Sequence, residues 1–428
     1  MNVVVVMASV TSRLITSPIY FRPYKYFAMK IGVLADFHLG YSRFNSDAFS
    51  QAAKALSSAV DSCDMILLAG DLFDSRTPKP EVLGESFSLF RIPLKKKWGA
   101  SLSSFKARDG RNESCGLPVA AIHGTHEMRA KSLANPIQLL EAAGFLVNVH
   151  AATAVFELGG EKVAVTGIGG VPEKQFKDAV KALDPKPVEG AFNVFMFHQT
   201  LREIIPQAPE DYSTADDLPS GFDLYVCGHI HSPLDREYSG KRVLIPGSTV
   251  LTQLRSEEQS KKGFFVFDTS SKSASFSEVG SRQFKMLELE LDSASPSSAR
   301  EECVKSVESA LQELGGEKPI LRVKLKGTLQ KGFTSSDLDL RSVERDFEDK
   351  AFVFIDSHLK SEDLRLQVEK LRSLKQDSVS VRELGLRLLK QSLAENGFSL
   401  ESDVDSLFDL LSDKKADNTR ILDELISS

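Results

Sequence analysis

The spacing of short apolar runs between residue 31 and about residue 268 most constrains the fold of this chain. Each run has the length of a buried strand, and a polar or glycine-bearing turn follows it. Helical patterns lie between the runs, and strands that alternate with helices are typical of α/β proteins. This part of the chain is therefore predicted to be an α/β sandwich. The predicted strands are Ile31–Ala35, Met65–Ala69, Val119–Ile122, Val163–Ile168, Val194–Phe197 and Leu224–Val226.

A second, smaller α/β unit is predicted to follow the sandwich. Leucine alternates with acidic residues in Met286–Asp292, and apolar residues alternate with basic residues in Leu321–Lys326, as in half-buried strands. Between them, apolar residues at helical spacing follow Pro296 until Gly315-Gly316 ends the pattern. A helix near Ser342–Lys350 and a strand at Phe352–Ile355 complete a β-α-β-α-β module.

The charged tail from about Ser361 is predicted to be helical. It carries two amphipathic stripes, at Val381–Leu393 and Val404–Leu411, which the turn-favouring pair Asn396-Gly397 separates. Such stripes either pack on their own domain or dock to another protein. Their charged surroundings and their separation from the sandwich favour docking.

The chain is thus divided into regions at 29–275, 283–357 and 361–428, after an over-extended or disordered N-terminal extension at 1–28. The apolar run Val3–Val6 is too short for a signal peptide, and no convincing charged segment precedes it. Met29-Lys30-Ile31 reads as the true start of the first strand. No apolar stretch reaches the roughly 18–20 residues that a membrane span needs, so a soluble protein is expected.

Charge and cysteine content limit the function classes. The net charge is −6, so any nucleic-acid binding must rest on a local basic face. The four cysteines are scattered and form no C-x-x-C pair, which argues against a disulfide framework or a structural zinc site. A reducing cytoplasm is the expected compartment.

Polar signals follow the predicted strands, where α/β sheets place ligands. Five of the eight histidines fall inside these signals; His123, His150 and His358 lie outside them and are interpreted as surface or strand-end residues. The signals are Asp36-Phe37-His38, Gly70-Asp71-Leu72-Phe73-Asp74, Gly124-Thr125-His126-Glu127, His198 and Gly228-His229-Ile230-His231.

These residue types predict a two-metal site. Carboxylate and imidazole suit Mn, Fe and Zn ions. The Asp-x-His and His-x-His pairs sit on extended segments, where residues two apart point the same way. A lone carboxylate such as Asp71 can bridge two cations, and cations about 3.5–4 Å apart polarise a phosphate and activate water. The residues therefore predict a phosphoesterase.

The order of these motifs resembles the calcineurin-like metallophosphoesterase family, whose fold is a four-layer α/β/β/α sandwich. The resemblance implies two divalent cations. One would be held by Asp36, His38, Asp71 and His231, and the other by Asp71, His198, His229 and the residue at position 125. It also implies that His126 assists the leaving oxygen without binding a cation.

Position 125 departs from the family pattern. The family motif is usually Gly-Asn-His-Asp/Glu, and here Thr125 replaces the asparagine whose carbonyl binds the second cation. A threonine hydroxyl is a shorter and poorer neutral ligand. A weaker second site is therefore expected.

Later features resemble the double-strand-break repair nucleases, that is, bacterial SbcD and its archaeal and eukaryotic counterpart, the meiotic recombination eleven nuclease. They are Pro246-Gly247-Ser248-Thr249, Ser256-Glu257-Glu258 and Lys262-Gly263. The second unit resembles the DNA-capping domain of that family, and the tail resembles helices that bind an SMC-like ABC ATPase of SbcC type. The resemblance implies a Mn²⁺-dependent homodimeric nuclease with 3′→5′ activity on duplex DNA and endonuclease activity on single strands.

Two basic segments are candidates for DNA contacts. One includes Lys95, Lys96 and Lys97, with aromatic residues nearby, and the other includes Arg322 and Lys324. A solvated loop and the protection of a strand edge explain the same charges equally simply.

Two other functions stay open. A phosphodiesterase or phosphatase for nucleotides or other small phosphoesters would not need the second unit or the tail. A scaffold subunit of the ATPase complex, weakly catalytic because of Thr125, would keep its assembly without cleaving DNA.

Overall fold

The computed structural model describes residues 29–96, 104–105, 116–130, 132–205, 207–315, 318–361, 380–395, 404–405 and 408. The predicted extension at 1–28 and most of the second amphipathic stripe lie outside these residues. The chain divides into two compact units: one reaches residue 286 and includes 316–320, and the other holds 287–315 and the residues from 321 on.

The first unit contains two sheets. The six-stranded sheet has the order β13-β12-β1-β2-β4-β5, with β1, β2, β4 and β5 parallel and with β12 and β13 joined antiparallel at one edge. All its strands are short. Their bounds are Lys30–Leu34 (β1), Met65–Ala69 (β2), Val119–Ile122 (β4), Val147–Asn148 (β5), Gly263–Asp268 (β12) and Ser273–Glu278 (β13).

The seven-stranded sheet has the order β10-β11-β9-β8-β7-β6-β3. Its central strands β11, β9, β8 and β7 are parallel, whereas β10, β6 and β3 pair antiparallel at the edges. The bounds are Ser104–Phe105 (β3), Ala152–Leu158 (β6), Glu161–Ile168 (β7), Phe192–Phe197 (β8), Leu224–Cys227 (β9), Leu234–Tyr238 (β10) and Lys241–Ile245 (β11). All six strands predicted from the sequence are present.

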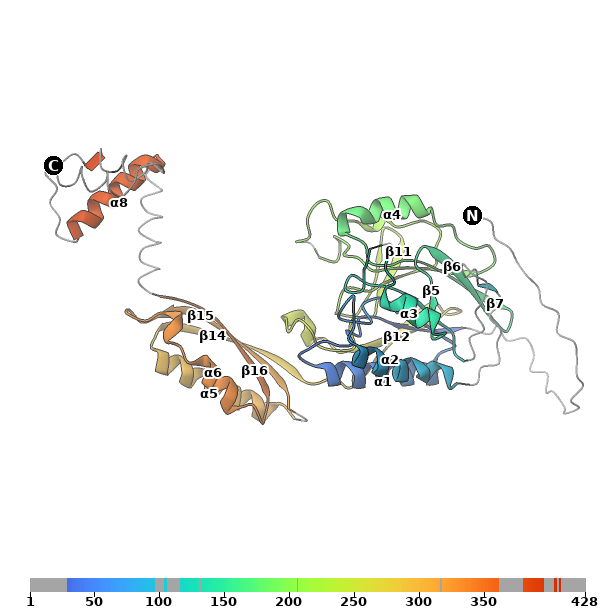
Figure 1. Ribbon diagram of the computed structural model, residues 1–428, viewed down its shortest axis with the longest axis horizontal. Helices are drawn as coiled ribbons and strands as arrows, with labels where there is room; N and C mark the ends of the chain where they lie inside the picture. The colour runs from blue at the N-terminus through green and yellow to red at the C-terminus, as the bar shows by residue number, and fades with distance from the viewer. Residues whose placement is uncertain are drawn as a thin grey trace, which may run out of the picture. The chain divides into compact units, whose positions relative to one another are not determined.

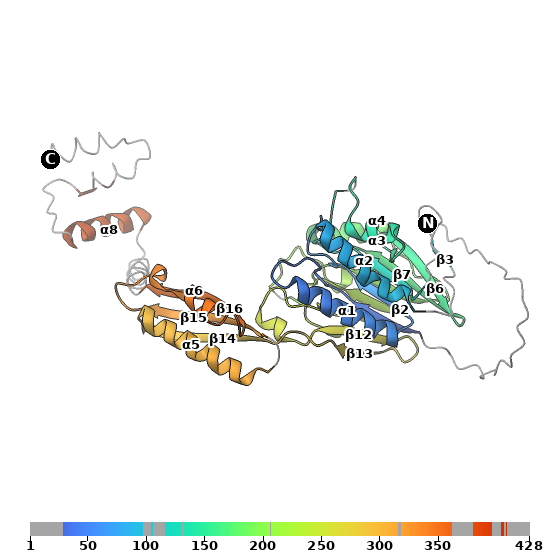
Figure 2. The same cartoon turned by 60° about the horizontal axis from the view of Figure 1, so that its bottom comes forward.

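The two sheets pack face to face between two layers of helices. Alternation within each strand divides its side chains between cores: Val33 of β1 faces the second sheet, whereas Leu34 faces the helices. Helices α1 (Asn45–Ser62), α2 (Pro80–Leu94) and α3 (Pro136–Ala142) cover the first sheet, as Figure 2 shows for α1 and α2. Helix α4 (Phe176–Leu183) covers the second sheet (Figure 1). The predicted four-layer α/β/β/α sandwich is confirmed.

Three short 3₁₀ helices lie in the loops of this unit: η1 (Glu173–Gln175), η2 (Ala215–Asp217) and η3 (Ser256–Gln259). Cys63, Cys227 and Cys303 are buried free thiols. Among the residues described, no helix is both long and apolar enough to cross a bilayer.

The second unit is built around a three-stranded sheet with the order β14-β15-β16. Its strands are β14 (Phe284–Ala294), β15 (Ile320–Leu329) and β16 (Phe352–Ser361), and its helices are α5 (Pro296–Glu313), η4 (Ser335–Asp337) and α6 (Leu340–Asp346). Val307 of α5 packs with Val323 and Leu325 of β15 in one core. The alternation predicted for β15 is present, since Lys324 between these two residues stays partly exposed.

The described part of the tail contains α8 (Val381–Glu395). Lys390 of this helix forms an ion pair with Asp405 at 3.1 Å. Gly385 lies against the Phe408 ring so closely that a Cβ would overlap it. The first predicted stripe therefore contacts residues of the second.

Candidate metal centre

The loops after the parallel strands carry the predicted ligands to one place. Asp36 and His38 follow β1, and Asp71 follows β2. Backbone hydrogen bonds join the two loops: Asp36 N donates to the Gly70 carbonyl oxygen at 2.9 Å, and His38 N donates to the Asp71 carbonyl oxygen at 3.1 Å. His198 follows β8, and His229 and His231 follow β9 in the facing sheet. The carboxyl ends of strands from both sheets thus supply the site.

The backbone at these residues is strained. Asp36, His38, Asp71 and His229 have φ angles of 53°, 48°, 49° and 77°, in the left-handed region that non-glycine residues rarely adopt. Such conformations cost about 1–3 kcal/mol each and persist where the surrounding structure holds them, often at functional sites. Gly124 is required at its position, because a Cβ there would overlap the Asp71 carboxylate.

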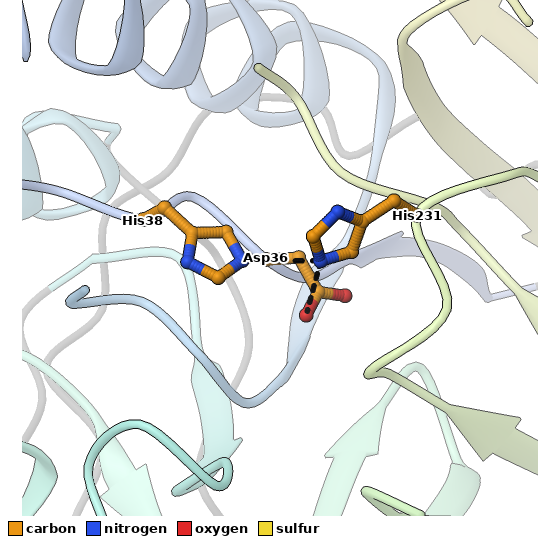
Figure 3. Close-up of side chains that lie close together, drawn as sticks. All are labelled: Asp36, His38 and His231. Carbon is orange, nitrogen blue, oxygen red and sulfur yellow. Dashed lines mark hydrogen bonds and ion pairs between the residues drawn. The ribbon is translucent and has the colours of Figure 1, made fainter. Parts of the chain in front are cut away.

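The first cation group consists of Asp36, His38 and His231, whose candidate ligand atoms lie within 4.8 Å of one another. The Nε2 atoms of His38 and His231 are 3.2 Å apart, and Nε2 of His231 is 4.0 Å from Oδ1 of Asp36 (Figure 3). The backbone nitrogen of His229 donates to the Asp36 carboxylate at 3.2 Å.

The second cation group consists of Asp71, His198 and His229, also within 4.8 Å of one another. His198 is fully buried; its Nε2 lies 3.0 Å from Oδ2 of Asp71, and its Nδ1 lies 2.6 Å from the Ala69 carbonyl oxygen. Because a carbonyl only accepts, Nδ1 of His198 donates to it.

The side-chain geometry fits a cation in the first group. Nδ1 of His38 lies 3.1 Å from the Asp74 carboxylate, and Nδ1 of His231 lies 3.1 Å from the Glu258 carboxylate. These acceptors assign the ring protons to the Nδ1 atoms, so both Nε2 lone pairs point at each other. Two facing lone pairs beside a buried carboxylate repel unless a cation lies between them.

The pKa values of the buried ligands reflect the concentration of charge. Burial raises the pKa of Asp36 well above its usual range. Burial also tends to raise the pKa of Asp71. The adjacent His198 has the larger opposite effect and holds the Asp71 pKa far below its usual range. Burial lowers the pKa of His198, yet Asp71 reverses this effect and raises it to about 9. Cation binding at the second group therefore requires His198 to release a proton.

Two further imidazoles, those of His229 and His231, are already suited to ligation. Burial lowers the pKa of His229 to about 3 and that of His231 to about 4, so both rings are neutral at neutral pH. Neutral imidazole is the form that binds a metal. The donor set, carboxylates with neutral imidazoles, suits Mn, Fe or Zn.

The loop after β4 places Thr125 and His126 beside Asp71. The Thr125 hydroxyl donates to Oδ2 of Asp71 at 3.3 Å, and the His126 backbone nitrogen donates to Oδ1 at 2.8 Å. The side chain of His126 is 46% exposed, and its Nδ1 lies 3.1 Å from the Asp74 carbonyl oxygen and 3.5 Å from Oδ1 of the Asp74 carboxylate. His126 therefore joins neither of these two groups, although its candidate ligand atom lies within 4.8 Å of those of His38 and Asp74, which form a third cluster with it.

Four acidic residues contact the site but were not predicted to have a role. Glu127 is buried and accepts from the backbone nitrogens of Phe73 and Gly124 at 2.9 and 2.8 Å. Asp74, Glu127 and Glu258 lie inside motifs that the sequence singles out, so their positions were a usable signal. Glu173 lies in η1, 3.8 Å from Nε2 of His229, and no sequence motif pointed to it.

The histidines outside the motifs belong to neither cation group. His123 is buried after β4, and its ring centroid is 4.6 Å from that of His150. His358 is exposed on β16.

The basic residues predicted to contact DNA have varied surroundings. The Lys96 ammonium donates to the Val60 and Cys63 carbonyls at the end of α1, which gives this side chain a structural role. Arg322 pairs with Asp356 at 2.6 Å, and Lys324 is partly exposed. Lys95 is exposed at the end of α2, and Lys97 lies outside the described residues. Contact with DNA stays a prediction for all five.

Comparisons with known proteins identify the superfamily of this domain. The sequence model of the calcineurin-like phosphoesterase superfamily domain matches residues 29–272. The chain is 29% identical over 265 residues to the DNA double-strand break repair protein Mre11 of Methanopyrus kandleri, covering 56% of this chain and 54% of that protein.

Two further relatives carry similar names. The Mre11 protein of Sulfolobus acidocaldarius is 25% identical over 320 residues, covering 70% of this chain and 76% of that protein. The double-strand break repair protein mre-11 of Caenorhabditis elegans is 29% identical, covering 56% of this chain and 39% of that protein. The match spans about half the length of the first of these relatives, and less of the last. By its matched domain, its four layers and its paired ligand groups, the chain belongs to the calcineurin-like phosphoesterase superfamily.

Proposed function

We propose that this protein is a Mn²⁺-dependent DNA nuclease that acts in double-strand break repair. It would be a 3′→5′ exonuclease on duplex ends and an endonuclease on single strands. One observation carries the proposal: six side chains from distant loops converge as two adjacent ligand groups, in a chain similar to proteins named for this repair.

The two groups would hold two Mn²⁺ ions, with Asp71 shared between them. When bound, such a pair neutralises charge on a phosphodiester and lowers the pKa of water. The chain holds these ligands in place, since Asp36, Asp71 and His198 are buried and the backbones of Asp36 and Asp71 form hydrogen bonds. A fixed arrangement needs little reorganisation when charge develops on the substrate.

His126 would donate a proton to the departing 3′ oxygen. Its exposed ring borders Asp71, and its Nδ1 faces the Asp74 carbonyl and carboxylate, which leaves Nε2 for the substrate. A positioned general acid contributes roughly 10²–10⁴-fold to a rate. Asp74 lies between His126 and the cation ligand His38 and would orient both rings.

DNA would be held by basic residues outside the cation groups. Arg322 and Lys324 of β15 and Lys95, just after α2, are the proposed contacts. Because the whole chain is acidic, binding through these few residues should weaken with salt. The small α/β unit would serve as the DNA-capping domain.

The proposed partners are a second copy of the chain and an SMC-like ABC ATPase of SbcC type. The apolar stripe of α8 would dock to the ATPase as a helix in a groove. Phe87 of α2 and Leu139 of α3 are exposed large apolar residues on the outer helical layer, which supports a dimer through these helices. The buried free thiols support action in a reducing cytoplasm.

The test is cleavage of end-labelled duplex DNA in Mn²⁺ by the full chain and its Asp71→Asn variant. Loss of the shared carboxylate should abolish turnover, because neither ligand group then holds its cation correctly. Asp61→Asn, on the exposed surface of α1, is the matched control and should cleave like the wild type.

The scaffold alternative is separated by the same assay. Thr125 favours it, because the hydroxyl is a poorer ligand than the usual asparagine. A wild-type chain that dimerises and binds the ATPase but cleaves no DNA in Mn²⁺ would replace the nuclease proposal with this one. Equal cleavage by Asp71→Asn would contradict the two-cation mechanism.

A further inference from the structure

Glu258 lies behind the cation ligand His231 and belongs to neither cation group. It sits in η3, and its side chain is 3% exposed. Its Oε2 accepts from the backbone nitrogens of Gln253 and Leu254, both at 2.6 Å, and its Oε1 lies 3.1 Å from Nδ1 of His231. Backbone donors thus fix Oε2, whereas Oε1 faces the imidazole and also accepts from the Thr252 backbone nitrogen at 3.2 Å.

Thr252 and Lys262 complete the enclosure of His231. The Thr252 hydroxyl lies 2.9 Å from Nδ1 of His231 and donates to Oε1 of Glu258 at 3.2 Å. The buried Lys262 ammonium lies 3.7 Å from Oε1 of Glu258 and donates to the His231 carbonyl at 3.0 Å. A buried carboxylate needs such a counter-charge. Both the ring and the backbone of His231 are therefore held from behind.

This network determines which ring nitrogen faces the cation site. A carboxylate only accepts, and the Thr252 hydroxyl uses its proton on Glu258, so both neighbours of Nδ1 require it to donate. The Nε2 lone pair of His231 then points toward Asp36 and His38, as in Figure 3. A carboxylate behind a ligating histidine also raises the basicity of the ring.

The two cation groups differ in this respect. In the first group both imidazoles have a carboxylate at Nδ1, Asp74 for His38 and Glu258 for His231. In the second group Nδ1 of His198 faces the neutral Ala69 carbonyl, and the Glu173 carboxylate lies 3.8 Å from Nε2 of His229, not beside its Nδ1. The imidazoles of the first group are therefore better oriented for binding a cation than those of the second group.

We propose that Glu258 is a positioning residue that holds His231 as the Nδ1–H tautomer and thereby makes the first group the tighter cation site. The inference rests on the proposed two-cation site and adds an order of filling, in which the first group fills at lower cation concentration. In this arrangement the Thr252 hydroxyl hydrogen-bonds Glu258 beside Nδ1 of His231, and Lys262 balances the charge of the buried carboxylate.

The test is the Glu258→Gln variant of the full chain. The backbone nitrogens of Gln253 and Leu254 will keep the amide oxygen, so the amide NH₂ will face Nδ1 of His231 and the ring proton will move to Nε2. Titration with Mn²⁺ by calorimetry should show first-site affinity weakened about 10–100-fold and second-site affinity nearly unchanged. In the metal-free protein, ¹⁵N spectra of the imidazoles should show His231 changing from the Nδ1–H to the Nε2–H form, which a merely structural role would not produce.

Two further variants complete the design. Glu278→Gln makes the same substitution at an exposed carboxylate that pairs with Lys261 at 2.7 Å, and it should leave both affinities and the spectra unchanged. Thr252→Val removes the hydroxyl in a side chain of similar size. It should weaken the first site in the same direction by a smaller factor, and it decides the question if Glu258→Gln does not fold.

The outcomes separate this inference from the proposed function. Wild-type first-site affinity and an unchanged tautomer in Glu258→Gln would overturn the role of Glu258 while leaving the nuclease proposal standing. A wild-type chain that binds no Mn²⁺ at millimolar concentration would overturn the cation site itself, and this inference with it.

Discussion

Thr125 is a second feature that distinguishes the two candidate cation groups. Its hydroxyl donates to Asp71, so in this arrangement it presents a proton where an asparagine would present a carbonyl oxygen. The remaining ligands of the second group are Asp71, His198 and His229, and His198 must release a proton before it binds. Both features are expected to lower cation affinity at the second group more than at the first.

The substitution Thr125→Asn should therefore strengthen the second site. The amide carbonyl reaches farther than the hydroxyl and carries no competing proton on its oxygen. We expect second-site Mn²⁺ affinity to rise about tenfold, equivalent to about 1.4 kcal/mol, in a calorimetric titration. Thr125→Val keeps the shape and removes the oxygen, and it should not raise the affinity. A wild-type protein that fills both sites equally at low Mn²⁺ would contradict the expectation of a weak second site.

At the scale of single elements, β15 combines two functions through strict alternation. Leu321, Val323 and Leu325 are fully buried in the core of the second unit, whereas the intervening basic residues stay partly exposed. One strand can therefore support the fold with one face and offer positive charge with the other. The two faces should respond differently to mutation.

Leu325→Ala should destabilise the second unit by about 2–5 kcal/mol, because it removes buried methyl groups and leaves a cavity. The free energy of unfolding, measured with urea, tests this expectation. A loss below about 1 kcal/mol would mean that the core around β15 is looser than the structure has it.

Lys324→Ala should leave stability within about 0.5 kcal/mol of the wild type, since the residue is partly exposed. It should weaken DNA binding for all DNA sequences. The slope of the logarithm of the binding constant against the logarithm of the salt concentration should fall by about 1, as measured by fluorescence anisotropy at several salt concentrations. Unchanged DNA affinity with unchanged stability would contradict the DNA contact; protection of a strand edge does not apply either, because β15 is the central strand of its sheet.

At the scale of the whole molecule, the outer helical layer carries large apolar residues that are exposed at the surface. Leu139 is 43% exposed and Phe87 is 37% exposed, and the Phe87 ring lies 5.4 Å from that of Phe145 just after α3. Two helices that share such a surface can pair with the same surface of a second copy.

The wild-type chain is thus expected to be a dimer in light scattering coupled to size exclusion, and Leu139→Glu should be a monomer at micromolar concentration. A two-fold interface contains each residue twice, so one substitution buries two charges and costs binding free energy at both places. Ile205→Glu changes an exposed apolar residue beyond β8 and should leave the dimer intact. Dimeric Leu139→Glu would place the contact elsewhere.

Much of the fold was predictable from local pattern. The strands Met65–Ala69 and Val119–Ile122 have the predicted bounds, because continuous apolar runs between turns leave few alternatives. The convergence of six candidate ligands was predictable for a related reason, since each follows a strand and most stand near a glycine. They are Asp36, His38, Asp71, His198, His229 and His231. The second amphipathic stripe lies almost entirely outside the described residues.

The chain by itself determined the strands, the spacing of the ligands and the types of donor atoms, because these depend on residues close together in the sequence. Only the tertiary structure decided which side chains support those ligands. Glu258 reaches His231 across 27 positions, Asp74 reaches His38 across 36, and Lys96 turns out to cap a helix. Such contacts depend on how loops cross after the two sheets have packed, and no local periodicity encodes that crossing.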